Sequence, residues 1–211
     1  MIAAEVAESG FSVQWGALGL AFVLLALNGF FVAAEFALLA ARRSRIEQLA
    51  ADGNKRAVSA LAGIRELTLM LAGAQLGITM CSLGLGAVAE PAIAHIIEAA
   101  LGELIDLSET TLHVIGFTLG LSLVVFLHMV VGEMAPKSWA ISDPERSSLL
   151  LARPFRAFVR VFQPIIWLLN SLANVVVRLV GVEPQDERAM AHSPTDLILL
   201  LDESAGHGDI K

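Results

Sequence analysis

The sequence contains almost no cysteine and none of the short motifs that mark common nucleotide or zinc sites. Cys81 is the only cysteine in 211 residues, which excludes an internal disulfide, and we interpret it as a small packing residue in an apolar helix. There is no Walker loop, no dinucleotide-binding fingerprint and no cysteine/histidine metal cluster. An enzyme is therefore the class of protein that the sequence favours least.

Charged residues are scarce as well. They make up 17% of the chain, whereas 56% of the residues are hydrophobic and the mean hydropathy is +0.71. Such a chain is too apolar for a water-soluble domain of this length, so we expect an all-α integral membrane protein whose surroundings are the lipid bilayer. The formal net charge of -7 argues against a nucleic-acid partner.

Three apolar runs, about 13–41, 66–89 and 111–135, are long enough to cross a bilayer, which takes roughly 20 residues. The first run does not fit a cleavable signal peptide, because residues 1–12 are acidic rather than basic and the run is too long for a signal core. We expect it to remain as a membrane anchor. The sequence therefore predicts three spanning helices.

The connections between these runs differ sharply in charge, and lysine and arginine are missing from one of them. The second connection holds only acids, which are Glu98, Glu103, Asp106 and Glu109. Basic residues crowd the first connection and follow the third run: Arg42, Arg43, Arg45, Lys55, Arg56, Arg65, and then Lys137, Arg146, Arg153, Arg156 and Arg160. Positive loops stay in the cytoplasm, so we expect a plasma-membrane protein with its N-terminus outside and its C-terminus inside.

The remaining segments are expected to flank the membrane. Residues 42–63 fit a short interfacial helix with one apolar face. The apolar stretch 154–182 carries arginines at both ends, which favours helices along the inner interface, although a fourth span is the alternative. We expect residues 1–182 to form the transmembrane domain. Residues 183–211 are then an acidic cytosolic linker that leads to a domain absent from this chain.

Glu133 is a carboxylate at the end of the third apolar run, and intramembrane acids are commonly functional. Pro136 has no N–H, so the carbonyl of Gly132, four residues earlier, loses its helical partner. A free carbonyl beside a carboxylate is a ligand set for a hard cation. The alternative is a helix end broken by proline, with Glu133 reaching cytoplasmic water.

The second run carries a polar stripe. Gln75, Thr79, Ser82 and Gly86 fall on one helical face, which must contact protein or water rather than lipid. These side chains could contribute oxygen ligands. The alternative is a packing surface of small residues that form hydrogen bonds between helices.

Glu35 in the first run is expected at a depth similar to that of Glu133. Two buried carboxylates would repel each other or take up protons, and a bound divalent cation would keep both ionised. The alternative for Glu35 is an interhelical hydrogen bond, or an ion pair with Arg42 or Arg43. His128 is interpreted as a hydrogen-bonding residue between helices that could also titrate during transport.

Three separated motifs together resemble the transmembrane domain of the CorC/CNNM family of magnesium transporters. They are the run 30–38 (FFVAAEFAL), the runs 75–79 (QLGIT) and 82–86 (SLGLG) with Glu90-Pro91, and the run 132–137 (GEMAPK). The resemblance covers about residues 13–182. It implies a homodimer with three spanning helices per subunit, a belt of cytoplasmic juxtamembrane helices, an acidic linker, and nucleotide-binding CBS domains. ATP would then act only through CBS domains that this chain lacks.

The resemblance further implies export of Mg²⁺, coupled to entry of Na⁺, with the ion bound between the three helices. Glu133 and the Gly132 carbonyl match the third-helix ligand motif, and we add Glu35, Gln75, Thr79 and Ser82 as candidate metal ligands. The second helix departs from better-studied members, which carry asparagines there, so a partly hydrated Mg²⁺ or another cation is an open alternative. Two other functions also stay open: transport of Na⁺ or Co²⁺, and a scaffold that carries no ion.

Overall fold

The computed structural model describes residues 2–105 and 107–181, with side chains from Trp15 onward. The predicted acidic linker, residues 183–211, lies outside the described residues. The described elements are the helices α1 (Ile2–Ala40), α2 (Arg43–Ala51), α3 (Lys55–Arg65), α4 (Leu67–Leu104), α5 (Glu109–Leu127), the π-helix η1 (His128–Met134), α6 (Ala135–Ser142) and α7 (Pro144–Leu179). No strand occurs within these described ranges, which confirms the predicted all-α class.

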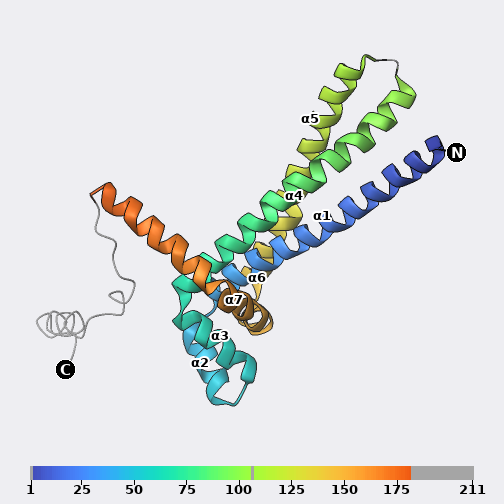
Figure 1. Cartoon of the computed structure of the whole chain (residues 1–211). Coiled ribbons are helices and arrows are strands. Elements are labelled where there is room, and N and C mark those ends of the chain that lie inside the picture. Colours follow the sequence, from blue (N-terminus) through green and yellow to red (C-terminus); the bar gives the residue numbers. More distant parts are fainter. Residues whose placement is uncertain (1, 106, 182–211) are drawn as a thin grey trace, which may run out of the picture. The chain divides into compact units, whose positions relative to one another are not determined.

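The helices α1, α4 and α5 run side by side within the compact unit that ends at Ile166 (Figure 1). The first two predicted apolar runs lie in α1 and α4, and the third continues from α5 through η1 to the start of α6. Over the full length of α1, α4 and α5, polar and apolar residues are not separated onto opposite faces. The partner of the third run changes along its length: α5 packs on α4, whereas α6 packs on α1. The short η1 between them contacts both α1 and α5.

Four helices are long and apolar enough to cross a bilayer: Trp15–Ala40, Leu67–Leu104, Glu109–Ser142 and Pro144–Leu179. The first three contain the predicted spans. The fourth is α7, in which polar and apolar residues separate onto opposite faces far more clearly than in the other long helices. That separation is typical of a helix in the membrane interface, so the number of spanning helices stays a prediction.

The predicted interfacial helix at 42–63 is in fact two helices, because a tight turn separates α2 from α3. Gly53 has φ +86, a left-handed conformation that glycine adopts without strain. Asn54 then caps α3, since its side-chain oxygen accepts the backbone N–H groups of Arg56 at 2.9 Å and Ala57 at 3.4 Å. The turn residues Gly53 and Asn54 thus end one helix and begin the next.

The main core lies where the short helices meet the ends of α1 and α4. Phe31 packs edge-on against Phe155 with ring centroids 6.2 Å apart, and Ile46 and Met70 are buried in the same cluster. The first part of α7 is therefore anchored to the three-helix unit through aromatic contacts. This burial also fixes the N-terminal part of α4 against the C-terminal part of α1.

Gly77 of α4 lies directly on the Phe31 ring. A Cβ atom at this position would be only 2.7 Å from the ring carbons, closer than any side chain can approach. Glycine therefore sets the separation of α1 and α4 at this level, as small residues do between membrane helices.

We expect Gly77→Ala to destabilise the protein by about 1–3 kcal/mol, because the added methyl group must displace the buried Phe31 ring. The measurement is the free energy of unfolding in a mild detergent. Gly19→Ala in α1 is the control: nothing lies within 4 Å of its Cβ position, and it should leave stability unchanged or raise it by up to about 1 kcal/mol. Equal effects of the two substitutions would contradict this account of the α1–α4 contact.

Candidate functional site

The third apolar run changes from α-helix to π-helix at His128. In η1 the Ala135 N–H donates to the carbonyl of Val130, five residues earlier, and Pro136 follows with no N–H to donate. A π-helical turn is wider than an α-helical turn, and such turns are frequent at functional sites. The sequence pointed to this segment through Pro136, and the structure shows the altered backbone there.

Asn28 of α1 is the centre of the polar contacts around η1. It is 0% exposed, and its Nδ2 donates to the Gly132 carbonyl at 3.0 Å. Its Oδ1 accepts a hydrogen bond from Ser82 Oγ of α4 at 3.2 Å. One amide thus links all three long apolar segments. A buried amide in an apolar surrounding needs such partners, because leaving them unpaired costs several kcal/mol.

Glycine at position 132 makes this contact possible. A Cβ there would lie 2.8 Å from the His128 ring, 3.0 Å from Leu25 and 3.2 Å from Asn28 Nδ2. Any larger residue would push Asn28 away from the carbonyl that it binds.

His128 and Glu133 complete the group. His128 Nε2 lies 3.2 Å from Ser82 Oγ and 3.6 Å from Glu133 Oε1. Ser82 gives its single proton to Asn28, so it can only accept from His128, which places the proton of a neutral imidazole on Nε2. We call these five residues, Asn28, Ser82, His128, Gly132 and Glu133, the Asn28 cluster.

The carboxylate of Glu133 is the charged member of the Asn28 cluster and is only loosely paired. Its side chain is 38% exposed, and the 3.6 Å separation from His128 is too long for a hydrogen bond. Within the described part of the chain, no three His, Cys, Asp or Glu side chains gather so as to hold a metal ion. A cation here would therefore be held by Glu133 together with carbonyl, amide and hydroxyl oxygens. That set suits hard cations.

Glu35 lies at another level of the bundle. Glu35 is two turns from Asn28 on α1, and Gln75 is two turns from Ser82 on α4. Each pair is therefore separated by about 10.5 Å along its helix axis. Gln75 of α4 and the positive charge of Lys137 lie near enough to the Glu35 carboxyl group to act on it. The ion pair considered from the sequence is not formed: Arg42 binds Glu145 at 2.8 Å and Arg43 binds Glu47 at 3.0 Å.

The structure thus places the predicted ligands in two separate groups, with Thr79 outside both. Gly132, Glu133 and Ser82 are brought together in the Asn28 cluster. Glu35 and Gln75 form a separate pair. Thr79 joins neither, because its Oγ1 donates to the carbonyl of Gln75 on its own helix at 2.7 Å.

Asn28 was missed as a functional residue when the sequence was read alone. A signal for it was present: Asn28 is the one asparagine in the first apolar run, and it lies seven residues before Glu35 on the same helical face. His128 was interpreted as a hydrogen-bonding residue between helices, and its contact with Ser82 agrees with that role.

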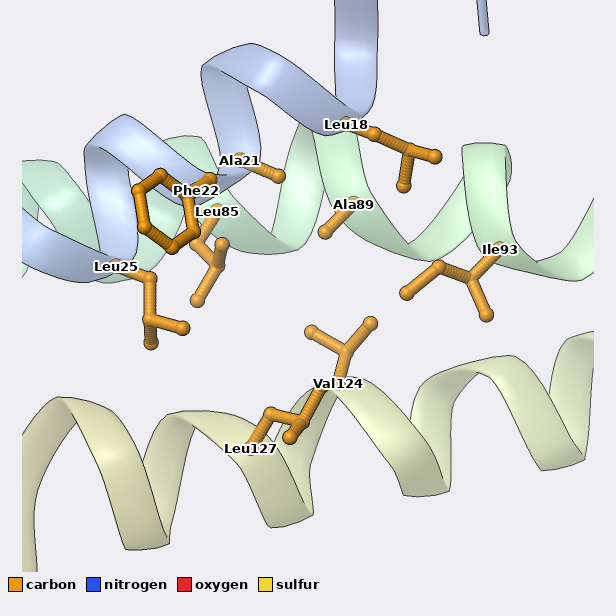
Figure 2. Close-up of a pocket in the computed structure, with 9 residues that line it drawn as sticks. All are labelled: Leu18, Ala21, Phe22, Leu25, Leu85, Ala89, Ile93, Val124 and Leu127. Carbon is orange, nitrogen blue, oxygen red and sulfur yellow. The ribbon is translucent and has the colours of Figure 1, made fainter. Parts of the chain in front are cut away.

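An apolar cavity of about 170 Å³ borders the Asn28 cluster on the side of the α1 N-terminus. Figure 2 shows side chains from α1, α4 and α5 pointing into it, and every atom drawn in them is carbon. Its lining is Leu18, Ala21, Phe22, Leu25, Leu85, Ala89, Ile93, Val124 and Leu127. Such a surface offers no ligand to an ion. The polar residues Glu35, Gln75 and Lys137 lie on the other side of the Asn28 cluster.

Comparison with known proteins gives consistent matches. Residues 19–211 match the family described as the cyclin M transmembrane N-terminal domain. The chain is 44% identical to the UPF0053 protein YhdT of Bacillus subtilis over 188 residues, which is 89% of this chain and 41% of YhdT. It is 43% identical to an uncharacterized protein of Mycobacterium tuberculosis over 90% of this chain and 53% of that protein. The chain thus spans about half the length, or less, of these relatives.

We expect Asn28→Leu to lower the free energy of unfolding by about 1–3 kcal/mol, because it leaves the Gly132 carbonyl and the Ser82 hydroxyl without their partner in an apolar surrounding. Chemical unfolding in detergent measures this change. Asn170→Leu, the same substitution at an exposed position on α7, serves as the control and should change little. An Asn28→Leu protein as stable as the parent would show that the amide does not hold the three segments together.

Proposed function

Because the chain belongs to the cyclin M transmembrane domain family, we propose that it moves a divalent cation, with Mg²⁺ as the primary substrate, across the plasma membrane. We infer that the direction is export, coupled to entry of Na⁺. The observation that carries the proposal is the Asn28 cluster, in which oxygen atoms of α1, α4 and η1 form one hydrogen-bonded group with His128, and His128 lies 3.6 Å from the loosely paired Glu133 carboxylate. The chain covers only part of its relatives, so this activity is proposed for the transmembrane unit.

The ligand chemistry supports a hard cation. Glu133 supplies the charge, the Gly132 carbonyl and the Asn28 amide oxygen each have a second lone pair, and the Ser82 hydroxyl oxygen lies beside them. Mg²⁺ requires six ligands in octahedral geometry and loses its water reluctantly. The Asn28 cluster offers fewer than six oxygens, so the proposed substrate is a partly hydrated ion that keeps some of its water.

The surroundings of the Asn28 cluster support uptake from the cytoplasmic side. Glu35 and Gln75 lie two turns away, toward the C-terminal end of α1, and provide polar groups along that route. The apolar cavity on the other side offers an ion nothing but carbon. With the N-terminus external, as the charges of the connections predict, we infer that ions reach the Asn28 cluster from the cytoplasm.

A homodimer is part of the proposal. Gln75, Thr79 and Gly86 are exposed in the single chain although they lie within a helix long enough to span the membrane. Polar side chains at that depth need protein or water rather than lipid, and a second copy would supply the cover. Native mass measurement in mild detergent that found only monomers would contradict it.

We expect Glu133→Gln to abolish most of the rise in melting temperature that Mg²⁺ gives the parent protein. At an effective dielectric constant of 20, a unit charge 4 Å away contributes about 4 kcal/mol, and about twice that for a dication. Glu35→Gln should weaken the response less, because its charge lies about 10.5 Å further along α1, and Ser82→Ala should weaken it least, because water can replace a neutral oxygen at a cost of about 0–2 kcal/mol. The measurement is thermal stability over a Mg²⁺ series. If the Glu133→Gln protein kept the full Mg²⁺-dependent rise in melting temperature, the proposed ion site would be wrong and Glu133 would serve only in packing.

His128 gives a specific reason to test Co²⁺ as the alternative substrate, because imidazole nitrogen is a better ligand for transition metals than for Mg²⁺. The same stability series is run with Co²⁺, and each ion is then followed as flux into liposomes that contain the purified protein. A His128→Gln substitution that reduces the Co²⁺ response and spares the Mg²⁺ response would favour the alternative. Flux of neither ion would favour the scaffold.

A further inference from the structure

A second cavity, of about 460 Å³, lies at the far end of the bundle from the apolar cavity. It is formed by the start of α3, by α6 and by the first turns of α7. The residues that line it are Asn54, Arg56, Trp139, Asp143, Arg146, Ser147, Leu149 and Leu150. It shares no residue with the Asn28 cluster and has no part in the proposed transport step.

Ser147 is the unusual residue in this cavity. It is 1% exposed, and its Oγ has no hydrogen-bond partner among the described residues. The next residue, Ser148, shows the ordinary solution, since its Oγ donates to the Glu145 carbonyl at 2.9 Å. A buried hydroxyl without a partner is unfavourable, so an acceptor oxygen in the cavity would satisfy it. Ser147 therefore points to a ligand that carries such an oxygen.

The charges of the lining indicate that this ligand is an anion. Arg56 and Arg146 are exposed, and neither forms an ion pair within the described part of the chain. Asp143 is the one opposing charge, and its Oδ1 accepts the backbone N–H of Arg146 at 3.3 Å. Two guanidinium groups against one carboxylate leave a net positive site. Guanidinium groups bind phosphate through paired hydrogen bonds.

The depth of the cavity indicates where the anion comes from. The continuous segment Glu109–Ser142 has 34 residues and is about 51 Å long, whereas the hydrocarbon core is about 30 Å thick. At least one of its ends must therefore leave the core. Ala140 packs with Ala37, close to the end of α1, and its neighbour Trp139 is 45% exposed, as expected for a residue at the lipid–water interface.

We propose that this cavity binds the headgroup phosphate of an anionic phospholipid from the adjacent leaflet. Arg56 and Arg146 hold the phosphate oxygens, and Ser147 donates its unpaired hydroxyl to one of them. Trp139 and Leu150 provide the apolar edge that the glycerol and the first acyl carbons require. The lipid would join α3, α6 and α7, the elements that surround the inner end of the bundle.

The test compares the purified protein in phosphatidylcholine nanodiscs with and without phosphatidylglycerol. We expect phosphatidylglycerol to raise the melting temperature of the parent by on the order of 4 °C at tenfold excess over Kd. Arg146→Gln and Ser147→Ala should lose most of this shift. Arg153→Gln, an exposed arginine on the same helix outside the cavity, is the matched control and should keep it.

Ser147→Ala also separates binding from folding. Without anionic lipid this variant should be as stable as the parent or more stable, because it removes an unpaired buried hydroxyl. A full phosphatidylglycerol shift in Ser147→Ala and Arg146→Gln would overturn the proposal. An equal shift with inorganic phosphate alone would also overturn it, since the site would then bind a free anion. If Arg153→Gln lost the phosphatidylglycerol shift to the same extent, the shift would come from general surface charge and the proposal would be wrong.

Discussion

The hydrogen bonds of a single amide, Asn28, hold the polar centre of this bundle together. Its nitrogen binds the Gly132 carbonyl and its oxygen receives the Ser82 proton, so each of the three apolar segments contributes one group to a connected network. These two bonds also determine the hydrogen-bonding roles of the other side chains in the cluster. Ser82 has no second proton to give, His128 must donate to it, and Glu133 is left without a short hydrogen bond. A carboxylate without a close partner within a membrane-spanning segment is unfavourable, and a cation would relieve it.

Close helix contacts allow this network to form. Gly77 brings α4 against the Phe31 ring, and Gly132 leaves room for Asn28 to reach a backbone carbonyl. Gly77 supplies no candidate ligand, and Gly132 supplies only its backbone carbonyl. Each glycine lacks the side chain that would otherwise keep the polar groups apart. The protein therefore builds its polar centre from small residues that set distances and from a few polar residues that use them.

Much of this could be predicted from the sequence, because membrane spans depend on local composition. The apolar runs lie within α1, α4 and the segment from α5 to α6, and the family resemblance is confirmed by the match over residues 19–211. Contacts between helices were harder to predict, since they depend on rotation and register. Arg42 was considered as a partner of Glu35, but it pairs with Glu145, 103 residues away in sequence. Asn28 was passed over because its partner is a backbone carbonyl, which the sequence does not display.

The π-helix η1 changes which face of the third apolar segment points toward the other helices. Each residue of an α-helix turns the chain by about 100°, so one extra residue within a wide turn rotates everything after it by about that angle. Ahead of η1, Gly116, Gly120 and Val124 face inward, and α5 packs on α4; beyond η1, Ala140 faces inward, and α6 packs on α1. A single straight α-helix could align only one of these two faces. The widened turn lets one continuous segment follow one neighbour over half of its length and a different neighbour over the rest.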